Sequence, residues 1–146
     1  MKREIKFRAW DKEKHCWYEP IHEAYKGNLF ELLVGFGGDL SAHTMNGMIH
    51  ESMWPDRFEL MQFTGLKDRN GTEIYEGDIL SYHSFYEGDW YNQSGIGYVI
   101  WDEEGHSIAI RGNNGEELYL CSTWDIAKNY GGEVIGNIYE NPELLS

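Results

Sequence analysis

The sequence is poor in cysteine and proline. Its two cysteines, Cys16 and Cys121, lie far apart and outside any C-x-x-C pair. A disulfide framework or a zinc ribbon is therefore not expected, and both thiols are expected to be reduced. The chain has 3 prolines against 17 glycines, which predicts tight turns formed mainly by glycine.

Long apolar runs are also missing. No uncharged stretch approaches the roughly 18 residues of a membrane-spanning helix. The amino terminus, MKREIKFRAW, is charged from its second residue and lacks an apolar stretch long enough for a signal peptide. These two absences predict a soluble cytoplasmic protein with no membrane segment.

Positive charge is scarce over most of the chain, whose formal net charge is -13. Residues 1–26 carry seven Lys/Arg against five Asp/Glu, whereas residues 27–146 carry five against twenty. Affinity for a phosphate backbone comes mainly from Lys and Arg, so the body of the protein should repel nucleic acid, and DNA contact would have to use residues 1–26. The alternative is that the charges only keep an aromatic-rich β protein in solution.

What the chain does have is aromatic side chains, at 15% of its 146 residues. Aromatic residues favour the pleated, half-buried surfaces of sheets, which predicts a mainly β fold. The alternating IKFRAWD and the returning HCWYEP predict an N-terminal β-hairpin. Residues 25–34 are ambiguous, because their leucines fit a helical stripe but the segment is short. Residues 35–39 predict a flexible break, and 45–56 predict a turn-rich connection with a tight turn at Asn46-Gly47.

The second half of the chain alternates strands with turn signals, including Asn70-Gly71, Gly77-Asp78 and the acidic tip DEEG. Residues 122–131 predict one short helix, and Asn141 is expected to cap a helical turn that begins at Pro142. We therefore expect a hairpin and connecting region over 1–60 and a strongly bent antiparallel barrel over 61–146, as one compact unit. Its core is predicted to include Ile74, Ile79, Val99 and Ile108.

Three long and distinctive segments follow one another along the chain. They are IKFRAWD at 5–11, FTGLKDRNGTEIYEGDIL at 63–80 and VIGNIYENPELL at 134–145. Together they resemble the YopX family of phage and prophage proteins. The resemblance implies a mainly β fold with an SH3-like barrel, a phage or prophage origin and no assigned biochemical activity. It supplies no catalytic residues.

Residues with acid/base or metal-binding chemistry fall in turns. Glu76 and Asp78 form a carboxylate pair, but Asp beside glycine is typical of a turn, with Asp78 bonding the backbone and Glu76 facing solvent. The run 102–104, Asp-Glu-Glu, lacks the alternating spacing of a calcium loop and indicates a solvated hairpin tip. The six histidines show no metal-binding spacing. We expect no catalytic residue, metal or cofactor.

The remaining candidate is an aromatic loop over 84–95. It contains Phe85, Tyr86, Trp90 and Tyr91 between glycines and polar residues. Exposed, these side chains would form a partner surface; alternatively, they fold back over the barrel or extend two strands. The sequence thus favours a non-enzymatic phage or prophage protein that binds a host or phage protein, or a second copy of itself. A role on nucleic acid is the alternative, through the N-terminal hairpin or as an acidic competitor for a DNA-binding protein.

Overall fold

The computed structural model describes residues 4–18, 29–44, 46–85, 92–112, 117–119 and 132–146. Its elements are β-strands and short helices. It divides into two compact units. The first unit comprises Met1–Phe7 and Met61–Ser146, and the second unit comprises Arg8–Leu60. Almost all regular structure in the described residues is strand, so the prediction of a mainly β fold is confirmed. No described helix has the length and apolar character needed to cross a membrane.

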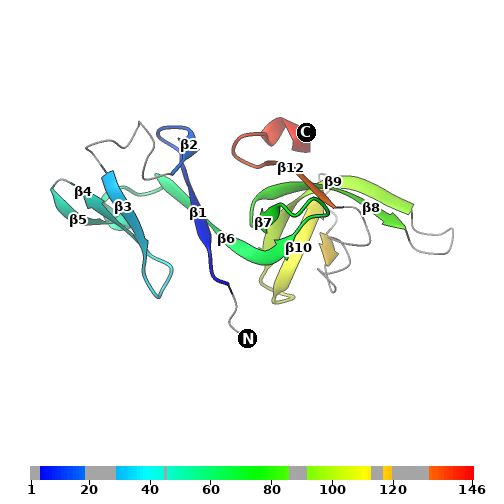
Figure 1. The fold of residues 1–146 in the computed structure, drawn as a ribbon, viewed down its shortest axis with the longest axis horizontal. Helices are drawn as coiled ribbons and strands as arrows, with labels where there is room; N and C mark the ends of the chain where they lie inside the picture. Colours follow the sequence, from blue (N-terminus) through cyan, green and yellow to red (C-terminus); the bar gives the residue numbers. More distant parts are fainter. Residues whose placement is uncertain (1–3, 19–28, 45, 86–91, 113–116, 120–131) are drawn as a thin grey trace. The chain divides into compact units, whose positions relative to one another are not determined.

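The first unit is built on a five-stranded antiparallel sheet in the order β11-β10-β9-β8-β12. The sheet curls into an open half-barrel (Figure 1), and the SH3-like topology stays a prediction. The long β6 ends in this unit, where it pairs with β7, and the short helix η3 closes the chain. The bounds are β6 Phe58–Lys67, β7 Glu73–Tyr75, β8 Asp78–Phe85, β9 Asn92–Asp102, β10 Ser107–Gly112, β11 Glu117–Tyr119, β12 Glu133–Asn137 and η3 Pro142–Leu145.

Four fully or almost fully buried side chains form the core of the first unit: Ile74, Leu80, Val99 and Ile110. Ile108, half-buried, packs against them, so three of the four predicted core residues belong to this cluster. Ile79 does not, although it is fully buried. Successive residues of a strand point to opposite faces, so Leu80 faces the cluster and Ile79 the other side of β8.

Buried carboxylates hold the turns of the first unit. The Asp68 side chain accepts hydrogen bonds from the backbone N–H groups of Asn70, Thr72 and Val134, at 2.8, 2.9 and 3.0 Å. This links the turn after β6 to β12. Of the predicted Asn70-Gly71 pair, only Gly71 takes a positive φ, of 83°. Glycine adopts this conformation without the steric cost that a Cβ brings.

The remaining carboxylates singled out from the sequence also serve turns. Asp78 Oδ2 accepts the N–H of Tyr75 at 2.8 Å, and the Asp102 carboxylate accepts the N–H groups of Glu104 and Gly105 at 3.1 and 2.9 Å. The interpretation of Asp78 as a turn residue is confirmed. At the predicted solvated tip, Glu103 and Glu104 are exposed, whereas Asp102 is buried. Glu76 is half-buried instead of facing solvent. Burial raises the pKa of the Glu76 carboxyl, partly offset by a backbone hydrogen bond with Gln62.

Replacing Glu76 by Gln is expected to stabilise the chain at neutral pH. Because the folded-state pKa of Glu76 lies above the ordinary value of a glutamate, the folded state binds the proton more tightly, and ionisation weakens the fold as pH rises. We expect the Tm of E76Q to exceed that of the parent by roughly 1–3 °C at pH 7.5. The difference should disappear below about pH 4, in thermal melts followed by circular dichroism; a constant difference across pH would contradict the assignment to Glu76.

The second unit begins with the predicted N-terminal hairpin, which is confirmed. Strand β1, Phe7–Asp11, pairs antiparallel with β2, Cys16–Trp17, and Trp10 lies opposite Trp17. Beside it, the first residues of β6 lie next to β1, since Lys12 N donates to Arg57 O at 2.8 Å. The Trp10 and Trp17 rings meet edge to face, with centroids 5.1 Å apart.

A three-stranded antiparallel sheet, β3-β4-β5, completes the second unit. Its elements are β3 Leu29–Val34, β4 Leu40–Thr44, β5 Gly47–His50 and the short helix η2 Glu51–Met53. The open choice over 25–34 is settled as strand from Leu29 on. The break predicted at 35–39 is the turn of the β3–β4 hairpin, in which Gly35 N donates to Asp39 O. One expectation was wrong: within the connection predicted over 45–56, residues 47–53 form regular structure. The expected Asn46-Gly47 turn does join β4 to β5, with Gly47 at φ 102°.

One face of this small sheet is buried around Ala42, which is fully buried in the row Leu32-Ala42-Ile49. The half-buried side chains packed against it come from β2, β3, the segment after η2 and β6: Cys16, Tyr18, Leu32, Trp54 and Phe58. Cys16 therefore fills part of an apolar core, as the sequence indicated, and it forms no disulfide. The predicted helix over 122–131 lies outside the described residues.

Candidate binding site

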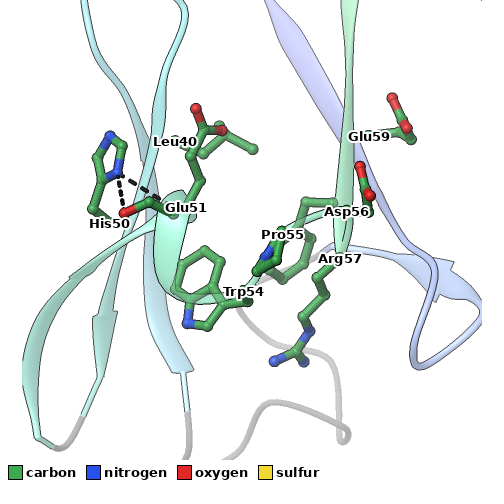
Figure 2. Close-up of a pocket in the computed structure, with 10 residues that line it drawn as sticks. Leu40, His50, Glu51, Trp54, Pro55, Asp56, Arg57 and Glu59 are labelled. Atoms are coloured by element: carbon green, nitrogen blue, oxygen red, sulfur yellow. Dashed lines mark hydrogen bonds between the residues drawn. The ribbon is translucent and has the colours of Figure 1, made fainter.

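The second unit contains a pocket of about 420 Å³ at the edge of its aromatic core. Figure 2 shows the pocket, with Trp54 and Pro55 between Leu40 and Glu51 on one side and Asp56 and Glu59 on the other. The lining comes from the first residue of β4, the end of β5, η2, the turn after it and the start of β6. The full lining is Leu40, His50, Glu51, Ser52, Trp54, Pro55, Asp56, Arg57, Phe58 and Glu59.

The apolar part of the pocket is held by stacked aromatic side chains. The rings of Trp54 and Phe58 meet edge to face with centroids 5.8 Å apart, and those of Phe58 and Tyr18 do so at 6.5 Å. The hydroxyl oxygen of Tyr18 in turn accepts the N–H of Leu32 at 2.9 Å. Because each ring is fixed by another, Trp54 presents a rigid aromatic surface to the pocket.

The segment that carries Trp54 is a compact turn. Trp54 N donates to Glu51 O at 3.0 Å, and Arg57 N donates to Trp54 O at 3.3 Å. Between them Pro55 fixes its own φ, and Asp56 takes a positive φ of 61°. Asp is among the few non-glycine residues that tolerate this conformation. The turn directs the backbone from η2 into β6 and places the Asp56 carboxylate at the pocket.

A buried ion pair anchors the end of this turn. Asp11 is fully buried, and its carboxylate accepts hydrogen bonds from Arg57 Nε and Nη2 at 3.3 and 3.0 Å. The same carboxylate accepts the backbone N–H groups of Glu13 and Lys14 at 2.9 and 3.1 Å. The Arg57 guanidinium also lies 3.5 Å from a Glu13 carboxylate oxygen and 4.9 Å from the Phe58 ring centroid. Its charge is thus matched inside the fold.

The rim of the pocket is acidic. Three carboxylates line it, those of Glu51, Asp56 and Glu59. Glu59 pairs with Lys12 at 2.9 Å. In the described part of the chain, no basic side chain pairs with Glu51 or Asp56. The pocket therefore combines an aromatic wall with two carboxylates whose charge is not matched by the described residues.

At one end of the pocket, Ser52, His50 and Asp39 form a chain of hydrogen-bonding groups. Ser52 Oγ lies 3.0 Å from His50 Nδ1, and His50 Nε2 lies 3.3 Å from Asp39 Oδ2. The order resembles a hydrolase triad, but His50 Nδ1 also accepts the backbone N–H of Ser52 at 3.2 Å and so caps η2. Both the His50 and the Asp39 side chains are about half exposed, whereas triad histidines act in sites held by buried partners. We interpret the group as a helix cap.

The partner surface predicted from the sequence lies elsewhere. Phe85 ends β8, and Tyr86, Trp90 and Tyr91 lie outside the described residues. Sequence reasoning missed the pocket, whose signal is the segment ESMWPDRFE at 51–59, where Trp-Pro and an aromatic residue alternate with three carboxylates. Within the described ranges, no cluster of three His, Cys, Asp or Glu side chains is arranged to hold a metal ion.

Comparisons with known proteins identify a family for this chain. The model of the YopX protein family matches residues 6–146. The crystal structure of protein EF1440 from Enterococcus faecalis is 29% identical, with a TM-score of 0.59, over 99% of this chain and 100% of that chain. The crystal structure of protein yopX from Bacillus subtilis is 22% identical, with a TM-score of 0.53, over 96% and 95%. The second likeness concerns the fold alone, and no match was found among curated proteins.

Proposed function

This chain belongs to the YopX family, and on that premise we propose that it is a phage or prophage accessory protein that works by binding another protein, without a reaction of its own. It acts in the cytoplasm of the bacterial host. The working surface is the pocket of the second unit, with Trp54 as its main anchor. The observation that carries the proposal is the wall of Trp54, Pro55 and Phe58 together with Glu51 and Asp56, with which no basic side chain of the described residues pairs.

The chemistry of the pocket favours recognition over catalysis. Binding sites combine an apolar wall with a few placed polar groups, and volumes of roughly 300–1,000 Å³ are usual for them. The pocket, at about 420 Å³, falls in that range. Tryptophan and tyrosine are enriched among the residues that contribute most to protein interfaces. Two of the polar side chains in its lining already have structural roles: His50 caps η2, and Arg57 pairs with Asp11.

Replacing Trp54 by Ala is expected to abolish capture of the partner. We expect a loss of about 2 kcal/mol or more in binding free energy, the usual threshold for an anchor residue. The measurement is affinity purification of the tagged full chain from bacterial cells carrying the phage or prophage, with mass spectrometry, followed by isothermal titration of the recovered protein against both chains.

The control separates loss of contact from loss of fold. The control is Trp101, a second tryptophan, which is 51% exposed and lies in β9 of the first unit. The W101A variant should bind the partner as the parent does. Because Trp54 packs in the core, W54F is the second variant, which keeps a ring on Phe58 and should retain part of the affinity. If W54A keeps its circular dichroism spectrum and binds as the parent does, the pocket is not the site.

A role on nucleic acid is the second candidate, and the N-terminal hairpin limits its direct form. Hydrogen bonds to Glu4 and then Glu73 raise the pKa of Lys6, which keeps it charged but paired. Lys12 pairs with Glu59, and the Arg8 guanidinium lies 4.4 Å from the Trp17 ring centroid. Retention of the chain on immobilised DNA that falls steeply with salt would favour direct binding. Capture of a basic DNA-binding protein would favour competition for it.

A further inference from the structure

The charges around the pocket specify the chemistry of its occupant. Among the described residues, the pocket lining and the side chains paired with it carry two full positive charges. Arg57 is held by the buried carboxylate of Asp11, and Lys12 is paired with the partly exposed carboxylate of Glu59. The carboxylates in the same set are more numerous. They are Asp11, Glu13, Asp39, Glu51, Asp56 and Glu59, against Lys12 and Arg57. An acidic occupant would be repelled, whereas a basic one would meet an opposite charge.

The aromatic wall suits a cation as well as an apolar group. A lysine or arginine side chain placed over a tryptophan ring is attracted by the ring's negative face, while its methylene groups pack on apolar surface. The described residues of the second unit already contain such contacts, with Arg8 over Trp17 at 4.4 Å and Arg57 over Phe58 at 4.9 Å. Trp54 offers the same kind of surface in the pocket, whose lining also includes Glu51 and Asp56.

We propose that the pocket binds a basic segment of the partner protein, with one lysine or arginine side chain seated between Trp54 and the carboxylates of Glu51 and Asp56. This inference rests on the proposed function and narrows it to a basic partner. The formal net charge of -13 acts in the same direction, because it draws a basic protein toward the chain and keeps acidic ones away. Charge complementarity of this kind sets specificity and association rate more than it sets affinity.

The test uses a library of random 12-residue peptides displayed on phage particles and panned on the immobilised full chain. Peptides retained by the parent but not by W54A are synthesised, and their dissociation constants are measured by fluorescence anisotropy. Each peptide is compared with a version in which its lysine is replaced by norleucine or its arginine by citrulline, which are uncharged and of similar shape. The matched protein variants are E51Q/D56N at the pocket and E103Q/E104Q at the exposed β9–β10 turn.

The expected result is that Trp54-dependent peptides share a lysine or arginine. Removing its charge should weaken binding to the parent at least tenfold, and the E51Q/D56N variant should lose affinity to a similar degree. That variant should also discriminate little between charged and uncharged peptides. Since Asn tolerates the positive φ of residue 56 as Asp does, the double variant should stay folded, and E103Q/E104Q should match the parent because it removes the same charge elsewhere.

Two other outcomes separate the inference from the proposed function. If the Trp54-dependent peptides lack a basic residue, or bind equally well with citrulline or norleucine, the preference for a cation is overturned and protein binding at the pocket stands. If no peptide depends on Trp54, or on Glu51 and Asp56, the pocket is not a protein-binding site, which overturns both.

Discussion

An Asp11→Ala chain is expected to unfold with a free energy about 3 kcal/mol or more below that of the parent. Removing one partner of a buried ion pair leaves the other charge uncompensated, which typically costs about 3–5 kcal/mol. Asp11 is fully buried, and besides Arg57 it holds two backbone N–H groups of the β1–β2 turn. The measurement is urea unfolding followed by far-UV circular dichroism, with the free energy extrapolated to water.

Glu13 provides the matched control for this prediction. It contacts the same guanidinium at 3.5 Å, but its side chain is 63% exposed, and exposed pairs contribute about 0–1 kcal/mol. E13A should therefore cost less than about 1 kcal/mol. Because Arg57 lines the pocket, D11A should also weaken partner binding, whereas E13A should not. Equal losses of stability in the two variants would show that the buried pair does not anchor the turn.

Replacing Ile110 by Ala is expected to destabilise the chain by about 2–5 kcal/mol, the usual cost of truncating a buried isoleucine and leaving a cavity. Ile110 is fully buried in the core of the first unit, with Ile74, Leu80 and Val99 around it. It also lies against Gly97 of the neighbouring strand, where an added Cβ would come within 2.4 Å of its Cγ2 atom. Packing of this density leaves little room for the core to relax.

Ile135 is the control for the core truncation. It belongs to β12 of the same sheet and is 37% exposed. I135A removes the same atoms but leaves no buried cavity, so it should lower the free energy of unfolding by less than about 1 kcal/mol in the same experiment. If I110A and I135A lowered the free energy of unfolding equally, the cluster would not be the core of the first unit.

The first unit was largely predictable from the sequence because its signals are local. Asp68 and Gly71 determine a turn through hydrogen bonds and a positive φ within five residues, and the runs beside DEEG alternate clearly. Local sequence signals could not decide whether Ile79 or Leu80 belongs to the core cluster. That choice depends on which face of β8 meets the core, and both residues are equally apolar and almost fully buried.

The second unit was predicted less well because its strands are short and their signals conflict. Leu29–Val34 carries leucines at helical spacing, yet it pairs with Leu40–Thr44, residues that become neighbours only when the turn at 35–39 closes. The pocket was missed for the same reason, because its lining residues also become neighbours only in the folded chain. Leu40 and Glu59 are far apart in the sequence, and nothing in either segment indicates that the fold brings both to Trp54.

The most direct measurement of the central claim is hydrogen–deuterium exchange on the full chain, alone and saturated with the captured partner protein. If the pocket of the second unit is the binding surface, peptides covering 50–59 should gain protection in the complex, and W54A should remove that protection. Protection confined to 84–95, the aromatic loop that the sequence singled out, or to the hairpin over 5–18, with 50–59 unchanged, would contradict the account.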